Sequence, residues 1–386
     1  MLRKSSLVAA GCLAALSLLS FAAQPPTITI SGNGSIALAI APFNGPDGAA
    51  VAKIVQNDLA LSGFFNITDA SRAAMTVNGA STGSSLQGKV VGRGGDNVLL
   101  HSYEGGAKEK GHAFANDIIE TLTGVKGMAG SKIAFISARS GKKELYTADY
   151  DGANVRQMTR DNTICGAPAL SPDGRLVAYT SYLHGYADIY TIDLGGGQRN
   201  RIVKFPGTNS GAAFSPNGDK VACSVSRDGN PELYVVSADG SGEHRLTHTP
   251  GVESSPTWSP DGREIIYSSD DVGSPQLFRI SASGGSGQRI STSYNYCTKP
   301  NWSPDGKKVA FNIRQGGSFQ IAVLDLAAGG VRVVSGGGEA RDPVWGPDSR
   351  HLLFTQDGNL MMLDVQTARK VSILGGMGAS EPTWTH

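Results

Sequence analysis

Hydrophobic positions in the last two thirds of the chain form short alternating runs that recur at a nearly constant spacing. Each unit starts with a large apolar anchor and a turn of the S-P-D-G type, and runs rich in β-branched and aromatic residues follow it. A unit of about 40–45 residues with four strands is typical of a β-propeller blade. The anchors are Leu170, Phe214, Trp258, Trp302, Trp345 and Trp384, which lie 44, 44, 44, 43 and 39 residues apart.

Both ends of the repeat region carry an incomplete unit. Residues 132–159 supply three strand-like runs that lack a first strand, and residues 380–384 supply a first strand that lacks the other three. Together they complete a sixth blade, and closing the ring also pairs the sheet edges that an open stack would expose. The pattern therefore predicts a six-bladed β-propeller over residues 130–386 that is closed by its C-terminal strand.

The recurring S-P-D-G turns have a structural explanation. Proline fixes φ at the second position of a type I turn, aspartate bonds within the turn, and glycine accepts a positive φ. A ring of metal ligands is the alternative for these acids, and Asn217 in the second copy argues against it. We therefore predict no metal site and assign turn formation to the acids Asp173, Asp261, Asp305 and Asp348.

The residues before the propeller follow a different pattern. Residues 47–62 place their apolar side chains on one helical face, with Asp47 near the N-terminus of the helix. Residues 110–123 predict a second helix that ends at Gly124. Strand-like runs cover residues 27–31, 36–43, 86–93 and 97–106, and the last two form a hairpin. This order predicts a small α/β (α+β) domain over residues 24–129.

The first residues have the composition of an export signal. A positively charged start with Arg3 precedes an apolar run over residues 7–21, which is too short to span a bilayer with its flanks. We predict a signal peptide over residues 1–22 that is cleaved near Ala22, and we find no later segment apolar enough for a membrane helix. A lipoprotein signal would use Cys12, but the apolar run continues past that cysteine.

Charge and cysteine content narrow the functional classes. The formal net charge of +1 argues against a nucleic-acid surface, which would require clustered positive charge. After export three cysteines remain, so at least one thiol stays free in an oxidising compartment. Cys165 and Cys297 occupy equivalent positions in opposite blades, beyond disulfide reach, and Cys223 lies inside a strand. We therefore predict no disulfide.

The domain order and two N-terminal segments resemble a known family. An export signal, a small α/β domain and a run of S-P-D-G blades follow one another, as in the TolB propeller proteins of the periplasmic Tol-Pal system. The segments I-V-Q-N-D-L-A-L-S-G-F-F at 54–65 and D-I-I-E-T-L-T-G-V-K-G at 117–127 carry the resemblance further. The Gly/Ser-rich residues 76–100 and the G-P-D-S turn of the fifth copy depart from the family pattern.

The resemblance implies a non-enzymatic scaffold without a cofactor. Members of this family link the outer-membrane lipoprotein Pal with TolA, and the complex supports outer-membrane invagination at cell division and outer-membrane integrity. We therefore expect a monomeric periplasmic protein that binds Pal and TolA, with other outer-membrane proteins as further candidate partners. We expect no nucleic-acid partner and no transmembrane segment in the mature chain.

The resemblance also implies two binding sites. The loops before the innermost strands match family positions implicated in Pal binding, at the mouth of the central channel. The extreme N-terminus of the mature chain matches the segment that engages TolA, and its strand propensity would suit addition to a partner's sheet edge. The expected Pal-binding residues are Thr208, Gly211 and Ser254, with Cys165, Cys297 and Arg341 as neighbours; the expected TolA-binding residues are Thr27, Ile28, Thr29 and Ile30.

Two other classes of function stay open at this point. An exported propeller hydrolase would need a catalytic set in the channel, and a carbohydrate- or ligand-binding propeller would bind small molecules without binding Pal. The sequence contains no G-x-S-x-G nucleophile elbow, no G-x-x-x-x-G-K-[ST] loop and no H-E-x-x-H motif. We therefore predict no catalytic residues.

Overall fold

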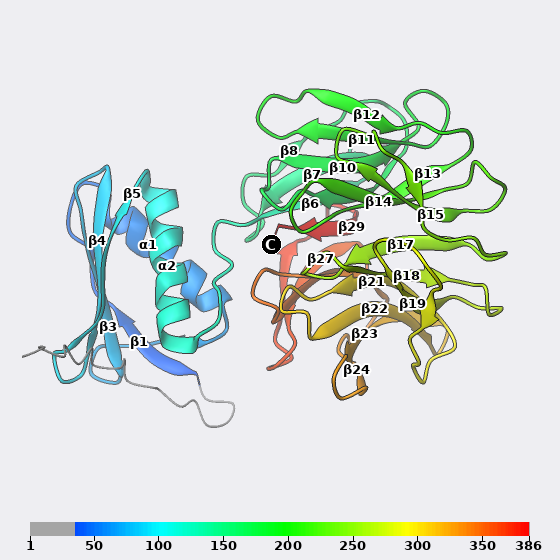
Figure 1. Ribbon diagram of the computed structural model, residues 1–386. Coiled ribbons are helices and arrows are strands. Elements are labelled where there is room, and N and C mark those ends of the chain that lie inside the picture. The colour runs from blue at the N-terminus through cyan, green and yellow to red at the C-terminus, as the bar shows by residue number, and fades with distance from the viewer. Residues whose placement is uncertain (1–34, 386) are drawn as a thin grey trace, which may run out of the picture.

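The computed structural model describes residues 35–385. The signal peptide over residues 1–22 and the expected TolA-binding residues 27–30 lie outside this range. The described chain starts with a five-stranded sheet in the order β2-β1-β3-β4-β5, and two helices pack against it (Figure 1). Its elements are β1 (Ile36–Ile40), α1 (Gly48–Leu61), β2 (Phe65–Ile67), β3 (Met75–Ser81), β4 (Ser85–Gly92), β5 (Asn97–Glu104) and α2 (Ala107–Thr123).

The glycines in the middle of this sheet make room for aromatic rings. A Cβ atom at Gly79 would lie 2.3 Å from the ring of Phe43, and one at Gly88 would lie 2.8 Å from the ring of Phe114. Both rings belong to the core between the sheet and the helices. Close packing therefore explains Gly79 and Gly88 within the Gly-rich residues 76–100. The predicted β4–β5 hairpin is confirmed by antiparallel pairing.

Asp47 stands at the N-cap of α1, as predicted, but its side chain makes no capping hydrogen bond. Its carboxylate instead lies 2.7 Å from the Nζ atom of Lys110, which is fully buried in α2. The Lys110 ammonium also donates to Ser81 Oγ at 2.8 Å and to Gly83 O at 2.7 Å. This buried ammonium, followed by the Ser81 hydroxyl, lowers the pKa of Asp47. The ion pair ties both helices to the β3–β4 turn.

The rest of the described chain forms six four-stranded sheets arranged as a ring (Figure 1). We number the blades along the chain and start from the one that holds β6. Blade 1 consists of β29 (Ala379–Trp384), β6 (Lys132–Ser137), β7 (Glu144–Asp149) and β8 (Arg156–Gln157). Blade 2 consists of β9 (Cys165–Leu170), β10 (Leu176–Ser181), β11 (Asp188–Asp193) and β12 (Arg199–Val203).

The other four blades repeat this antiparallel order from the channel outward. Blade 3 has β13 (Asn209–Phe214), β14 (Lys220–Val225), β15 (Glu232–Ser237) and β16 (His244–Arg245); blade 4 has β17 (Glu253–Trp258), β18 (Glu264–Ser269), β19 (Gln276–Ser281) and β20 (Gln288–Arg289). Blade 5 has β21 (Cys297–Trp302), β22 (Lys308–Gln315), β23 (Ser318–Asp325) and β24 (Val331–Val333); blade 6 has β25 (Ala340–Trp345), β26 (His351–Gln356), β27 (Asn359–Asp364) and β28 (Lys370–Leu374).

The C-terminal strand closes the ring, as the incomplete end units predict. β29 pairs with β6 in antiparallel register, with Thr383 opposite Ala134. The indole Nε1 of Trp384 donates to Ser131 Oγ at 2.7 Å, and Lys132 N donates to Thr385 Oγ1 at 3.0 Å. Blade 1 is therefore built from both ends of the propeller sequence, which confirms the predicted six-bladed architecture.

Side chains of the innermost strands also join neighbouring blades. Trp302 N donates to Thr257 Oγ1 at 3.2 Å, and Trp345 N donates to Asn301 Oδ1 at 2.8 Å. Trp345 is completely buried, and the indole Nε1 of Trp258 reaches Ala213 O in the preceding blade at 3.0 Å. The anchors Trp258, Trp302 and Trp345 therefore each contact the preceding blade.

The turn acids are engaged in their own turns. Asp173 Oδ1 accepts from Ser171 Oγ at 2.5 Å and from Arg175 N at 3.0 Å, and Asp261 and Asp305 repeat this pattern. The G-P-D-S copy differs because Asp348 is buried and also binds His351, with a distance of 2.5 Å to its Nδ1 atom. The turn role predicted for these acids agrees with this bonding.

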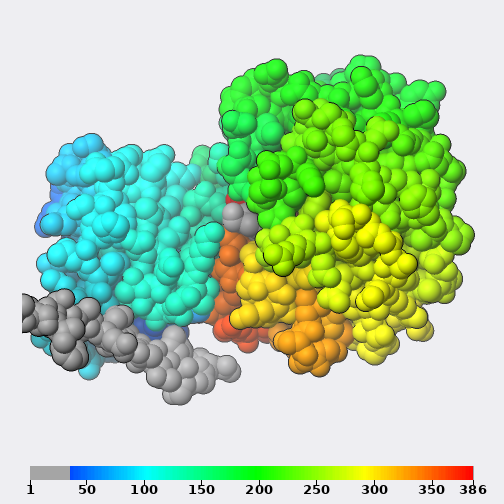
Figure 2. All heavy atoms as spheres, in the orientation of Figure 1, coloured from blue at the N-terminus to red at the C-terminus, as the bar shows by residue number. Residues whose placement is uncertain are grey.

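The N-terminal domain packs against one end of the propeller, where it meets the orange and red C-terminal residues (Figure 2). Asp58 of α1 is buried and bonds to His112 Nδ1 at 2.7 Å and to Tyr150 Oη of blade 1 at 2.5 Å. In blade 6 the Arg350 guanidinium lies 3.8 Å from the centre of the Phe64 ring and donates to Asp364 at 2.9 Å. We call this the near end of the propeller.

No helix within residues 35–385 is both long enough and apolar enough to cross a membrane.

Candidate docking site at the propeller channel

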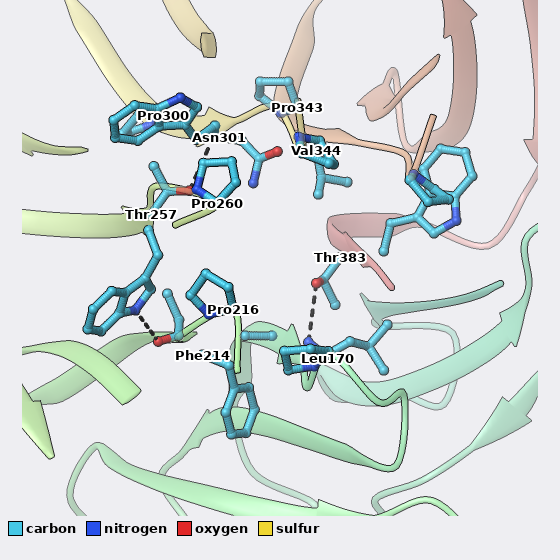
Figure 3. A pocket seen from close by; sticks show the side chains of 18 of the residues that line it. Leu170, Phe214, Pro216, Thr257, Pro260, Pro300, Asn301, Pro343, Val344 and Thr383 are labelled. Atoms are coloured by element: carbon cyan, nitrogen blue, oxygen red, sulfur yellow. Dashed lines mark hydrogen bonds between the residues drawn. The ribbon is translucent and has the colours of Figure 1, made fainter. Parts of the chain in front are cut away.

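The central channel contains a cavity of about 820 Å³, to which every blade contributes its innermost strand (Figure 3). Proline rings line much of the wall, and Figure 3 shows Pro216, Pro260, Pro300 and Pro343 around the opening. Proline has no backbone N–H donor and a fixed φ, so these rings give a stiff wall with few donors. Polar contacts inside the channel must therefore come from a small number of side chains.

Each innermost strand carries one residue with a positive φ at equivalent positions. At this point the pairing with the second strand shifts register, so the backbone bulges towards the channel. A left-handed backbone costs a residue with a Cβ atom roughly 1–2 kcal/mol, and glycine avoids this cost. The six residues are Ala167, Gly211, Ser255, Lys299, Asp342 and Glu381, with φ between +45° and +67°.

Three of these bulge residues form a charged cluster on one side of the channel. The Lys299 Nζ atom lies 3.8 Å from Glu381 Oε2, which also accepts from Ala167 N at 2.7 Å. Burial alone would lower the pKa of the Lys299 amine, but the nearby Asp342 and Glu381 carboxylates outweigh it and raise that pKa. Burial raises the pKa of Asp342. Within the cluster, Lys299 and Glu381 pair with each other.

The two openings of the channel differ. At the near end, the segment Gly124–Lys126 that follows α2 lines the cavity beside Pro172 and Pro347. The innermost strands begin at the opposite end. The loops that join the second and third strands of each blade lie at that end too. We call this opening the far mouth. It lies away from the N-terminal domain, so the described residues leave it open to a partner.

Four of the expected Pal-binding residues are reachable from the far mouth. Thr208 and Arg341 are exposed, Ser254 is half-buried, and Gly211 lines the channel. The Arg341 guanidinium lies 3.8 Å from the centre of the Phe319 ring. These residues come from blades 3, 4 and 6, and the fold brings them to one opening. Their role in binding stays a prediction.

The two cysteines require a correction. Cys165 and Cys297 begin their strands at the far mouth, but both side chains are completely buried. Burial raises the pKa of the Cys165 thiol to about 11, and its Sγ atom lies 3.8 Å from Thr159 Oγ1. These side chains pack between blades and cannot contact a partner directly. Cys223 is likewise buried, and all three thiols are free.

Glu144, Asp161 and Cys165 place ligand-type atoms within 4.8 Å of one another. However, Glu144 accepts from Thr159 Oγ1 at 2.5 Å, and Asp161 binds Arg199 at 2.7 Å. These bonds occupy the oxygens that a metal ion would need. The cluster is better explained as a hydrogen-bond network between blades 1 and 2.

The sequence analysis did not predict a pair of buried acids that lies behind the far mouth. Glu253 begins β17 next to Ser254, and Glu232 begins β15 in the preceding blade. One carboxylate oxygen of each is buried without a hydrogen-bonding partner among the described atoms. Burial, followed by the neighbouring Glu232 carboxyl, raises the pKa of Glu253. Two carboxyls in this arrangement favour sharing one proton.

The sequence analysis also missed the exposed apolar side chains at the far mouth. Ile164, Tyr182, Leu183 and Tyr186 are all exposed. The signal was present, because the segment S-Y-L-H-G-Y-A at 181–187 interrupts a set of polar loops. Strand periodicity cannot identify such residues, since it describes strands and not the loops between them.

Fold and site together define a closed six-bladed β-propeller with a small α/β domain at one end and an open channel mouth at the other. The family model described as the TolB beta propeller domain matches residues 119–386. The chain therefore belongs to the TolB β-propeller family, as the sequence resemblance predicts.

One solved structure resembles almost the whole chain. The crystal structure of TolB from Acinetobacter baumannii is 25% identical and superposes with a TM-score of 0.81. The alignment covers 91% of this chain and 97% of that one, so it includes both domains. A putative TolB from Agrobacterium tumefaciens is 19% identical with a TM-score of 0.52, and it supports the fold alone.

Curated relatives match over shorter segments. A TolB homologue from Chlorobium chlorochromatii is 57% identical over 63 residues, or 16% of this chain and 14% of that protein. The Tol-Pal system protein TolB from Geobacter sulfurreducens is 48% identical over 64 residues, or 17% of this chain and 15% of that protein. These alignments thus span about one seventh of each relative's length.

Proposed function

We propose that the chain is the TolB component of a Tol-Pal system, acting as a non-enzymatic scaffold in the periplasm. It binds the lipoprotein Pal at the far mouth and TolA through its N-terminal segment. In this role it supports outer-membrane invagination during division and outer-membrane integrity. The observation that carries the proposal is the likeness to a TolB structure across both domains. The names of the curated relatives support the same assignment.

The geometry of the propeller supports docking at the far mouth. The N-terminal domain and the segment after α2 occupy the near end, whereas Thr208 and Arg341 are exposed at the opposite opening. A docking surface requires accessible side chains on a rigid base, and the closed ring provides such a base. The channel residues Lys299 and Glu381 bind each other, which favours a structural role over a catalytic one.

The test is binding of the Pal homologue from the same organism to the purified full-length protein. Ser254→Trp places a bulky ring at the far mouth and should weaken binding at least about tenfold, as expected when a central interface position is obstructed. Ser241→Trp is the matched control, because Ser241 is exposed in the turn after β15, at the other end of its blade. It should leave binding unchanged.

Each result separates the candidate functions. Retained binding in Ser254→Trp would place Pal elsewhere on the protein, and no binding by the unmodified protein would overturn the proposed function. A protein that bound oligosaccharides or hydrolysed a substrate without binding Pal would instead support one of the two alternative classes.

Removal of residues 24–32 should abolish TolA binding and leave the folded propeller intact by circular dichroism.

A further inference from the structure

The largest group of exposed apolar side chains at the far mouth lies on two adjacent loops of blade 2, whereas the equivalent loops of blade 4 expose only Val252 and Val272. Tyr186 is 71% exposed and Ile164 is 55% exposed. Tyr182 and Leu183 are about 40% exposed, and Tyr182 N donates to Ile164 O at 3.1 Å. Two loops that are separated in sequence therefore meet to present four large side chains to solvent.

The other blades provide an internal comparison for this loop. The loops that join the second and third strands elsewhere are short or polar, and Val272 in blade 4 is their one exposed large hydrophobic residue within residues 35–385. Within residues 35–385, only blade 2 exposes three large apolar side chains in this loop, Tyr182, Leu183 and Tyr186, and the fold itself does not require them. Exposed aromatic clusters of this kind mark protein contact sites.

Cations surround the apolar cluster on the blade 1 side. Arg139, Lys142, Lys143 and Arg160 are all exposed, and none of them makes an ion pair with the described residues. Cys165 N donates to Lys143 O at 2.9 Å, which places this lysine at the start of β9 beside Ile164. Two acids lie nearby: Asp161 pairs with Arg199 at 2.7 Å, and the buried Glu144 accepts from Thr159 Oγ1 and from Asn162 N.

The opposite side of the far mouth has the reverse charge. The equivalent loop of blade 4 begins with Asp270 and Asp271, and Asp270 Oδ1 accepts from Val252 N at 2.7 Å. Charge across the mouth is therefore polarised, from basic at blades 1 and 2 to acidic at blade 4. A partner that covered the mouth would be oriented by this asymmetry, since complementary charge fixes the register of an interface.

We propose that Ile164, Tyr182, Leu183 and Tyr186, with their flanking cations, form a second contact surface for the protein docked at the far mouth. We name these residues together with Arg139, Lys142, Lys143 and Arg160 the basic–apolar patch. The facing surface of that partner carries acidic side chains around an apolar centre. The inference rests on the proposed function, and it adds the chemistry of the partner and a contact site outside the family positions.

Two observations favour a protein over a lipid surface as the occupant. The patch continues into the channel opening, because Ile164 is followed by Cys165 at the start of β9 and then by the bulge residue Ala167. The acidic loop at Asp270 lies on the same face and would oppose contact with a flat anionic membrane.

The test measures binding of the full-length protein to the Pal homologue for two double variants and two controls. Lys142→Glu with Lys143→Glu should weaken binding about tenfold or more at low salt, mainly through slower association. Leu183→Ala with Tyr186→Ala should weaken it by a similar factor, through faster dissociation. Circular dichroism and the melting temperature verify that each variant is folded.

The matched controls make the same chemical changes elsewhere. Lys220→Glu with Lys307→Glu reverses two exposed charges beside the turns of the near end, and Leu100→Ala removes an exposed leucine of the N-terminal domain. Both should leave affinity within about twofold, because surface residues outside an interface contribute little.

The outcomes distinguish this proposal from the proposed function. If the unmodified protein binds Pal and both double variants bind equally well, the basic–apolar patch proposal is overturned and the function stands. If the unmodified protein does not bind Pal, both are overturned. If the double variants lose binding only to phosphatidylglycerol vesicles and keep binding to Pal, the patch contacts lipid and the proposal is again overturned.

Discussion

The contact between the two domains at the near end and the basic–apolar patch at the far mouth treat charged side chains in different ways. At the near end, Arg350 and Asp364 are buried and bonded to each other, and Asp58 is buried between His112 and Tyr150. At the far mouth, cations of the basic–apolar patch are exposed and make no ion pair with the described residues. Paired, buried charges belong to an interface that the chain already forms with itself. Unpaired cations beside exposed aromatics fit an interface with another molecule.

The largest expected effect lies at the near end. Asp364→Asn removes one partner of a buried pair and leaves the Arg350 guanidinium uncompensated, at a cost of roughly 3–5 kcal/mol in the free energy of unfolding. Burial opposes the shift, but the bonds from Arg350 and Thr367 lower the pKa of Asp364 to about 2. Its stabilising contribution should therefore be present at neutral pH and lost as the pH falls through that value.

Urea unfolding measures the free energy of unfolding of Asp364→Asn and of a control variant. Arg341→Gln at the far mouth is the matched control, because its pairing with Glu339 is exposed and should contribute less than about 1 kcal/mol. Equal losses for the two variants would show that the two ends do not differ in the way described.

The next effect concerns the contact between the domains. Tyr150→Phe removes the hydroxyl that donates to the buried Asp58 and should cost about 1.5–3 kcal/mol, because hydrogen bonds to charged groups lie in that range. Limited proteolysis should then cut the chain faster between the domains. Tyr186→Phe makes the same change at an exposed position and should alter neither stability nor cleavage.

A smaller effect should appear in the pH dependence of stability. The folded pKa of Glu253 is raised, so the folded protein holds a proton that the unfolded chain has already lost. Stability from this pair is fully present below the usual glutamate pKa and declines as the pH rises through the folded value. Above the usual glutamate pKa, the free energy of unfolding should therefore decrease as the pH rises through the folded pKa of Glu253.

Glu253→Gln should flatten this decrease. The variant would copy the neighbouring blade junction, where the Asn209 amide donates to Asp188 at 3.2 Å. Denaturant titrations at several pH values measure the difference. An unchanged pH profile in the variant would mean that the two carboxyls do not share a proton.

The smallest effect concerns the channel bulges. Gly211→Ala would meet no close atom, since the added Cβ lies 3.7 Å from Ser255 N, but its φ of +67° would cost about 1 kcal/mol. Ser255→Gly at the equivalent position should be neutral or slightly stabilising, because relief of strain offsets the greater entropy of the unfolded chain. The melting temperatures of the two variants measure this difference, and equal destabilisation by both substitutions would refute the strain argument.

The sequence allowed the propeller to be predicted because its repeat records strand alternation and turn chemistry together. Equivalent repeat positions placed Cys165 and Cys297 at the channel mouth, but they could not show that both side chains turn inward between blades. Each innermost strand also shifts register at its bulge, as β9 does between Gly166 and Ala169. A bulge of this kind leaves no distinct mark in the hydrophobic pattern.

Side-chain pairs that join distant parts of the chain, within the N-terminal domain and between the two domains, were also out of reach of the pattern. Asp47 and Lys110 are 63 positions apart in the sequence, and Asp58 and Tyr150 are 92 positions apart. Periodicity and turn chemistry report on near neighbours in the chain, so such pairs have no local signal. The basic–apolar patch escaped for a related reason, since Ile164 and Tyr182 meet only when β9 pairs with β10.

The central claim is that the far mouth is the docking end of the propeller. Hydrogen–deuterium exchange of the full-length protein, with and without the Pal homologue, tests it without altering any residue. The account predicts slower exchange on binding in residues 182–187, 208–211 and 252–255, and unchanged exchange in the near-end turns. Protection of the near-end turns with no change at the far mouth would contradict it.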